Sequence, residues 1–190
     1  MRVCFHALLA SFVGLGSFHA QPMDQMLVDS KQVSYRGGLV VFSIPSDWVE
    51  EYEPEGGGMF FEEGEDTGTL RLNVTTFGSP KAITAESARE FLATAVGLPV
   101  ETLQNGNALA KRITKTTDRG QKITMYSWHL SASLPPETIR LANFTYTVLA
   151  SETQSSTTMK DLSFIEASIR QATFSNEHGV TSHPIKLTKH

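Results

Sequence analysis

Cysteine is almost absent from this chain: Cys4 is the only one among 190 residues, and it lies in the apolar N-terminal segment. If this segment is removed as a signal peptide, the mature chain has no cysteine, so it has no disulfide, no thiol nucleophile and no thiolate ligand for a metal. With 40% hydrophobic and 19% charged residues, the composition is that of an ordinary folded protein. The length fits a single domain that is stabilised by its hydrophobic core.

The motifs of the common enzyme classes are also absent. The sequence contains no GxSxG, HExxH, GxGxxG or Walker motif, and no Lys follows Gly56-Gly57-Gly58 as a phosphate loop would require. Ser127 and His129 share one face of an expected strand, where neighbouring side chains stand nearly parallel. That is a poor geometry for a nucleophile and its base. We therefore expect a non-enzymatic protein with no catalytic residues and no cofactor.

Basic patches are missing as well. The net charge is −4, and no cluster of Lys and Arg stands out along the sequence. Nucleic-acid binding needs such a cluster to contact phosphates, so nucleic acid is excluded as an expected partner.

The N-terminal segment has the pattern of a secretory signal peptide. Arg2 precedes an apolar run over residues 3–18 that is too short and too interrupted by glycine for a membrane span of about 20 residues. Cleavage is expected after Ala20, with Gly16 as a competing position. We predict a signal peptide at 1–20, a linker at 21–31, a single domain at 32–174 and a flexible tail at 175–190. The mature protein would be secreted or periplasmic, without a transmembrane span.

Apolar residues within 32–174 recur with two different periods, and a period of two residues predicts strands. A period of 3.6 residues predicts a helix over 85–96, capped by Thr84 and Gly97. The same period predicts a second helix over 159–172, capped by Ser155 or Ser156. The predicted strands are 32–35, 39–44, 59–63, 69–77, 108–117, 121–134 and 139–150. This order predicts an α+β fold, in which an antiparallel sheet of about six to seven strands, including the first two, has two helices packed on it.

Three short segments resemble the PsbP-like superfamily, which also includes Ran-binding nuclear-transport proteins, DcrB lipoproteins and secretion-system chaperones. They are Phe42-Ser43-Ile44-Pro45 followed by Asp47-Trp48, the strand Met59-Phe60-Phe61, and the alternating Leu70-Arg71-Leu72-Asn73-Val74. The resemblance covers about residues 32–174. It implies a binding or scaffolding role whose partner differs between families, and it brings no shared catalytic residues.

Acidic residues are concentrated in one segment. Residues 50–66 hold eight of the chain's 20 acids, without a Lys or Arg between them: Glu50, Glu51, Glu53, Glu55, Glu62, Glu63, Glu65 and Asp66. Three interpretations stay open. The segment forms a solvated rim, it meets a protein partner with a basic surface, or it binds a hard cation through Asp66, Glu63 and either Glu53 or Glu55. The spacing of an EF-hand is absent, so we predict no metal ligands.

We predict that the protein recognises another macromolecule, a protein with a basic surface, through this acidic segment and the neighbouring Trp48. The predicted partner-binding residues are Trp48, Glu53, Glu55, Glu62, Glu63, Glu65 and Asp66. The position of Trp48 just after a strand also favours a ring that packs on the end of the sheet. The alternative function is binding of a small ligand or a divalent cation in a cavity between the sheet and its helices.

Overall fold

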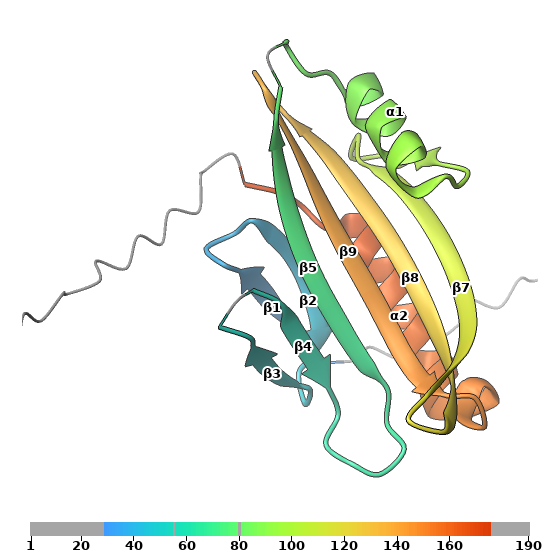
Figure 1. The fold of residues 1–190 in the computed structure, drawn as a ribbon. Coiled ribbons are helices and arrows are strands. Elements are labelled where there is room, and N and C mark those ends of the chain that lie inside the picture. The colour runs from blue at the N-terminus through green and yellow to red at the C-terminus, as the bar shows by residue number, and fades with distance from the viewer. Residues whose placement is uncertain (1–28, 55, 80, 176–190) are drawn as a thin grey trace, which may run out of the picture.

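The computed structural model describes residues 29–54, 56–79 and 81–175 (Figure 1). The predicted signal peptide, the predicted linker as far as residue 28, and residues 176–190 of the predicted tail lie outside the described residues. The fold is α+β, with a seven-stranded antiparallel sheet and two helices packed on it, as the sequence predicts.

The seven strands follow the order β3-β4-β5-β9-β8-β7-β6, and each pairs antiparallel with its neighbours. Long strands occupy the centre of the sheet and short strands its edges. The bounds are β3 Val49–Tyr52, β4 Gly58–Phe61, β5 Thr69–Gly78, β6 Glu101–Thr102, β7 Ala108–Asp118, β8 Gln121–Leu134 and β9 Thr138–Leu149. The turns predicted between β4 and β5, between β7 and β8, and between β8 and β9 are confirmed.

The first two strands do not belong to this sheet, so that part of the prediction is wrong. β1 (Ser30–Tyr35) and β2 (Val40–Pro45) form a separate two-stranded sheet. Side chains of β2 pack against one face of the main sheet. The ring of Phe42 contacts the rings of Phe60 and Phe144 in edge-to-face geometry, with ring centroids 5.3 and 5.1 Å away. Burial of these rings drives the packing without backbone pairing. The main sheet instead includes β3 and β6, which the sequence did not indicate.

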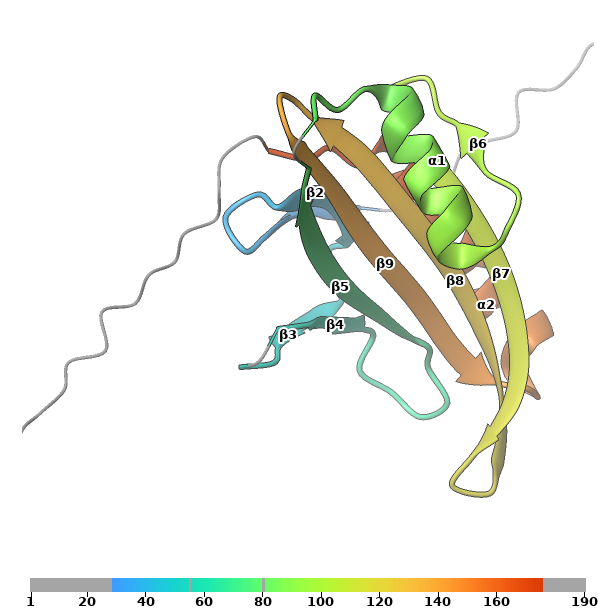
Figure 2. The ribbon, with the colours of Figure 1, turned by 45° about the horizontal axis from the view of Figure 1, so that its top comes forward.

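Helix α1 (Ala85–Val96) lies on one face of the main sheet, over β7 and β8 (Figure 2). Its N-terminus carries the predicted cap: the Thr84 side chain accepts from the Ser87 backbone N–H, and the Ser87 hydroxyl reaches back to Thr84. Gly97 ends the helix in the left-handed conformation, with φ 62°. Leu92 is fully buried against Ala108, Ala110 and Leu141 of the sheet.

Helix α2 (Ser156–Gln171) covers the opposite face together with β1 and β2 (Figures 1 and 2). A 3-10 turn, η1 (Glu152–Gln154), leads into it, and Ser155 is the N-cap, as predicted. Ile165 and Ile169 enter the main core. The core also contains aromatic and aliphatic side chains of β8 and β9, which bring Trp128 opposite Phe144.

Candidate functional site

Trp48 lies in the core rather than on a surface. Its side chain is 2% exposed, between β2 and β3, and its ring stacks on that of Tyr146 with centroids 6.2 Å apart and planes 10° apart. The residue that the sequence grouped with the partner-binding acids therefore supports the acidic segment from beneath. This is the packed ring that its position after a strand favoured.

The acidic segment is divided by β4. Glu53 follows β3 at one end of β4, while residues 62–66 form the turn into β5 at the other end. At the first end Glu53 lies 3.6 Å from Arg71. On β3 itself, Glu50 lies opposite Phe60 and 3.4 Å from Lys31, while Glu51 forms no ion pair among the described residues. Glu55 lies outside the described residues. Among the described acids, Glu53 and residues 62–66 thus lie at opposite ends of β4.

The turn at the other end, residues 62–66, is named the acidic hairpin. Glu63, Glu65 and Asp66 are exposed, and Glu62 is half-buried. In the part of the chain that the structure describes, none of these four carboxylates forms an ion pair. Asp66 has φ 61°, and the Thr67 hydroxyl donates to the Glu62 carbonyl at 2.8 Å, so the turn has a defined shape. In Figure 1 it projects past the end of the sheet.

A cavity of about 140 Å³ lies at the base of the acidic hairpin. Three carboxylates, an ammonium group and two aromatic rings contribute to its lining, which comprises Pro45, Asp47, Trp48, Glu62, Thr157, Lys160, Asp161 and Phe164. Carboxyl groups therefore extend from the hairpin tip toward the core.

Asp161 is the buried carboxyl group of this lining, with 7% of its surface exposed. Its Oδ2 accepts a hydrogen bond from the Tyr146 hydroxyl at 2.7 Å. Burial raises the pKa of Asp161, and the negative charges of Glu62 and Asp47 raise it further, against the opposing effects of the Tyr146 bond and of Lys160. Burial, the Asp161 hydrogen bond and its charge likewise raise the pKa of Tyr146.

The acids do not assemble a cation site among the described residues. Glu53 and the acidic hairpin lie at opposite ends of β4, and no three His, Cys, Asp or Glu side chains in ranges 29–54, 56–79 and 81–175 are grouped closely enough to hold a metal. What the acidic hairpin can do is attract positive charge on a larger partner, because its carboxylates form no ion pair with any cation in the described part of the chain.

Ser127 and His129 are not joined by a hydrogen bond in the described residues. His129 Nδ1 lies 2.7 Å from Asn143 Oδ1, and Ser127 Oγ lies 3.5 Å from Thr145 Oγ1. Both residues point to the sheet face that carries α1, in a region next to a cavity of about 310 Å³ between β4, β5 and β9. The alternation of Leu70-Arg71-Leu72-Asn73-Val74 places polar side chains of β5 on this face, and the sequence analysis did not identify the matching polar residues of β9, Asn143 and Thr145.

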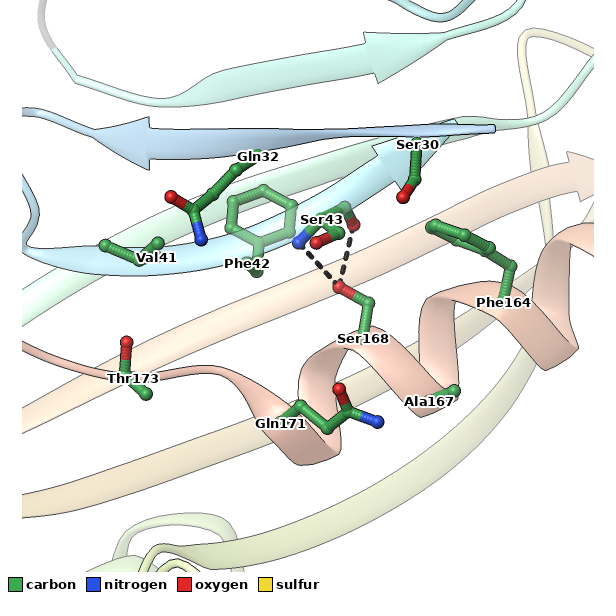
Figure 3. A pocket seen from close by; sticks show the side chains of 10 residues that line it. All are labelled: Ser30, Gln32, Val41, Phe42, Ser43, Phe164, Ala167, Ser168, Gln171 and Thr173. Atoms are coloured by element: carbon green, nitrogen blue, oxygen red, sulfur yellow. Dashed lines mark hydrogen bonds between the residues drawn. The ribbon is translucent and has the colours of Figure 1, made fainter. Parts of the chain in front are cut away.

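A third cavity is a groove between the β1–β2 sheet and α2, with a volume of about 330 Å³ (Figure 3). Its lining is uncharged: Ser30, Gln32, Val41, Phe42, Ser43, Phe164, Ala167, Ser168, Gln171 and Thr173. Ser168 joins the two walls, because its hydroxyl accepts from the Ser43 N–H at 2.8 Å and donates to the Ser43 carbonyl at 2.7 Å. The side chains of Gln32 and Gln171 reach into the groove from opposite walls (Figure 3).

Several solved structures share this arrangement of strands and helices. A protein of Bacteroides thetaiotaomicron is 15% identical with a TM-score of 0.54 over 78% of this chain, which spans only 49% of that structure's length. LpqN, involved in cell envelope biogenesis of Mycobacterium tuberculosis, is 14% identical with a TM-score of 0.53, over 77% of this chain and 91% of LpqN. The likeness is one of fold.

More distant matches include the families that the sequence resembles. The Ran-binding protein Mog1p of Saccharomyces cerevisiae is 13% identical with a TM-score of 0.42, over 77% of this chain and 96% of Mog1p. The PsbP protein CyanoP of Synechocystis is 12% identical with a TM-score of 0.38, over 88% of this chain and 99% of CyanoP. The predicted resemblance to PsbP-like and Ran-binding domains is confirmed as a weak likeness at low identity. No protein-family model matches the sequence, and no curated protein matches it significantly.

None of the helices within 29–54, 56–79 and 81–175 combines the length and the apolar character that a membrane crossing requires.

Proposed function

We propose that this chain is an exported, non-enzymatic binding or accessory protein whose acidic hairpin recognises a basic surface on a protein partner. The observation that carries the proposal is the difference between the two ends of β4. At one end Glu53 is paired with Arg71, whereas the four carboxylates of the acidic hairpin at the other end form no ion pair among the described residues. Unpaired, exposed carboxylates of one sign are available to a partner.

The structure beneath the acidic hairpin favours a defined recognition surface. Gly68 follows the turn so closely above the Tyr146 ring that a Cβ would overlap it, and Tyr146 is in turn held by Trp48 and Asp161. A preorganised turn loses little conformational entropy on binding. Its charge would raise the association rate and select the orientation of the partner more than it adds affinity.

The remaining predicted residues take secondary roles in this proposal. Trp48 positions the acidic hairpin from the core, and Glu53 lies toward the other end of β4, beyond the main contact. Export rests on the signal-peptide pattern of residues 1–20, and the likeness to LpqN, a protein of cell envelope biogenesis, is consistent with it.

Affinity capture from the native cell envelope tests the proposal with matched variants. The test variant is Glu63→Lys/Glu65→Lys in the acidic hairpin. The control is Glu90→Lys/Glu137→Lys, which changes the net charge equally at exposed sites on α1 and in the β8–β9 turn. We expect a protein that the wild type and the control retain and the test variant loses, with retention weakening as salt rises.

Two results would contradict the proposal. One is a partner that all three proteins retain equally. The other is a partner that the test and control variants both lose, since binding would then follow net charge rather than the position of the acids.

A small-ligand function is a second candidate, and the groove between the β1–β2 sheet and α2 favours it. A volume of about 330 Å³ lies within the range of ligand sites, and the lining mixes apolar side chains with amides and hydroxyls. Because no lining residue is a carboxylate, the groove suits an uncharged ligand rather than a divalent cation. A melting-temperature screen of neutral compounds on the wild type and on Gln171→Leu tests it, through the stabilisation that bound ligand confers.

A further inference from the structure

The main sheet has an open edge along most of β7. β6 pairs only with Ala108 and Leu109, so residues 110–118 have β8 on one side and, within the described residues, no strand on the other. All side chains from 111 to 118 are exposed. The unpaired edge of a strand presents N–H and C=O groups that can pair with another strand.

The β7–β8 turn shows which backbone groups are free. Arg119 and Gly120 have φ of 46° and 85°, so they form a two-residue hairpin turn whose flanking residues, Asp118 and Gln121, exchange hydrogen bonds. Hydrogen-bonded pairs then recur at every second residue of β7. The backbone groups that point to the open side belong to Lys111, Ile113, Lys115 and Thr117. Leu109, next in the same series, is paired with Glu101 of β6.

Positive charge and one apolar side chain accompany this edge. Ile113 is 64% exposed, more than any other large hydrophobic residue described. Residues 111–122, which cover the edge, its turn and the start of β8, contain five cations and one acid, Asp118, in a chain whose net charge is −4. Only one of these cations forms an ion pair among the described residues, Lys111 with Glu166 at 2.8 Å. The five cations are Lys111, Arg112, Lys115, Arg119 and Lys122.

We propose that the open edge of β7 binds an extended acidic segment of a partner protein, which joins the main sheet as an additional strand. The main-chain groups of the edge would supply hydrogen bonds, and the cations would select carboxylates at alternate positions of the incoming strand. A second copy of β7 fits poorly, because antiparallel pairing centred on Ile113 sets Lys111 opposite Lys115. The inference is independent of the acidic hairpin, which lies at the other side of the sheet.

Charged residues on an edge strand also protect against aggregation without binding anything. A peptide probe separates the two roles. The probe is fluorescein-labelled (Thr-Glu)4 with blocked ends, and its comparisons are (Thr-Lys)4, which reverses the charge, and (Pro-Glu)4, which keeps the charge but cannot pair as a strand. Binding is measured by anisotropy at about 50 mM and about 300 mM salt.

The variants address the backbone and the charge separately. Ile113→Pro removes one outward N–H without removing a β7–β8 hydrogen bond, and Ile113→Thr is its control, since it shortens the side chain but keeps the N–H. Lys115→Glu/Lys122→Glu reverses the charge with the backbone intact, so the test survives if the proline variant fails to fold. Circular dichroism and melting temperature report folding.

We expect (Thr-Glu)4 to bind the wild type at least about tenfold more tightly than either comparison peptide. Ile113→Pro and the charge reversal should each weaken binding by about tenfold or more, and Ile113→Thr by much less. Equal binding of (Thr-Glu)4 and (Pro-Glu)4 would overturn the proposal, as would no binding of (Thr-Glu)4 at low salt. A wild-type dimer in sedimentation that Ile113→Pro dissociates would also overturn it, because the edge would then be occupied by a second copy.

Discussion

The ring of Trp48 stacks on the ring of Tyr146, with planes 10° apart, and the Tyr146 hydroxyl donates to the buried carboxylate of Asp161. These contacts connect the segment after β2 with β9 and α2. They lie directly below the acidic hairpin, because Gly68 rests against the Tyr146 ring. The position of the proposed partner surface thus depends on a small buried aromatic and polar cluster.

Truncation of Trp48 should mainly affect stability. Trp48→Ala would leave a large cavity beside Tyr146, and we expect a loss of about 3–5 kcal/mol in the free energy of unfolding. Urea denaturation measures it. Glu63→Ser/Glu65→Ser, two exposed residues of the acidic hairpin, should change stability by less than about 0.5 kcal/mol. A Trp48→Ala protein of wild-type stability would contradict a supporting role for the ring.

Gly68 should be intolerant of any side chain. A Cβ at this position would overlap the Tyr146 ring, which cannot move away without losing its contacts with Trp48 and Asp161. We expect Gly68→Ala to cost about 1–3 kcal/mol of stability through overpacking. Gly78→Ala is the control, since a Cβ there meets nothing within 4 Å. Equal melting temperatures of the two variants would show that the hairpin base is not tightly packed.

Asp161 should make stability depend on pH in the acid range. Its pKa in the folded chain is raised, mainly by burial, above the unfolded value of about 3.9. The folded chain therefore holds this proton more tightly than the unfolded chain does. The resulting stabilisation is complete below about pH 3.9 and declines as pH rises through the folded pKa.

Asp161→Asn tests this linkage, because the amide oxygen still accepts the Tyr146 bond while the charge is removed. Relative to the variant, the wild type should lose stability as pH rises from about 4 to about 7. Urea denaturation of both proteins across this range measures the difference. A difference that is constant with pH would mean that the carboxyl titrates normally.

Glu166 should have the opposite dependence. Burial would raise the pKa of Glu166, but hydrogen bonds from Lys111, Trp128 and Arg170 outweigh it, so the pKa is lowered. The stabilisation is present above the unfolded value of about 4.3 and is lost as pH falls through the folded pKa. Because Glu166 and its cationic partners Lys111 and Arg170 are partly exposed, we expect Glu166→Gln to lower the free energy of unfolding by only about 1 kcal/mol at pH 7 and by less near pH 3. An equal cost at both pH values would contradict this.

Local patterns in the sequence were sufficient for most of the fold. The caps at Thr84, Gly97 and Ser155 depend on single residues and their neighbours, so they were predictable. The separate sheet formed by β1 and β2 was not predictable. The alternation of side chains along a strand shows which of them are buried, but not which sheet the strand joins. β3, with the sequence Val-Glu-Glu-Tyr, has one aliphatic residue and was hidden among the acids.

The candidate site was predictable in composition but not in arrangement. The sequence shows eight acids close together along the chain. Only the structure shows that β4 separates Glu53 from the acidic hairpin and that Glu53 forms an ion pair with Arg71. Trp48 adjoins the acids along the chain but is turned inward. The basic edge of β7 was missed because its cations are spaced along two strands, and the hairpin between those strands brings them together.

Site-specific crosslinking tests the central claim most directly. Cys4 is the only cysteine, so in a chain with Cys4→Ser the variants Glu65→Cys in the acidic hairpin and Glu90→Cys on α1 each carry a single thiol for a photoreactive label. Both are crosslinked in the native envelope, and the products are identified by mass spectrometry. We expect one protein with a basic surface to be crosslinked from position 65 and not from position 90. The same products from both positions, or none from position 65, would contradict recognition through the acidic hairpin.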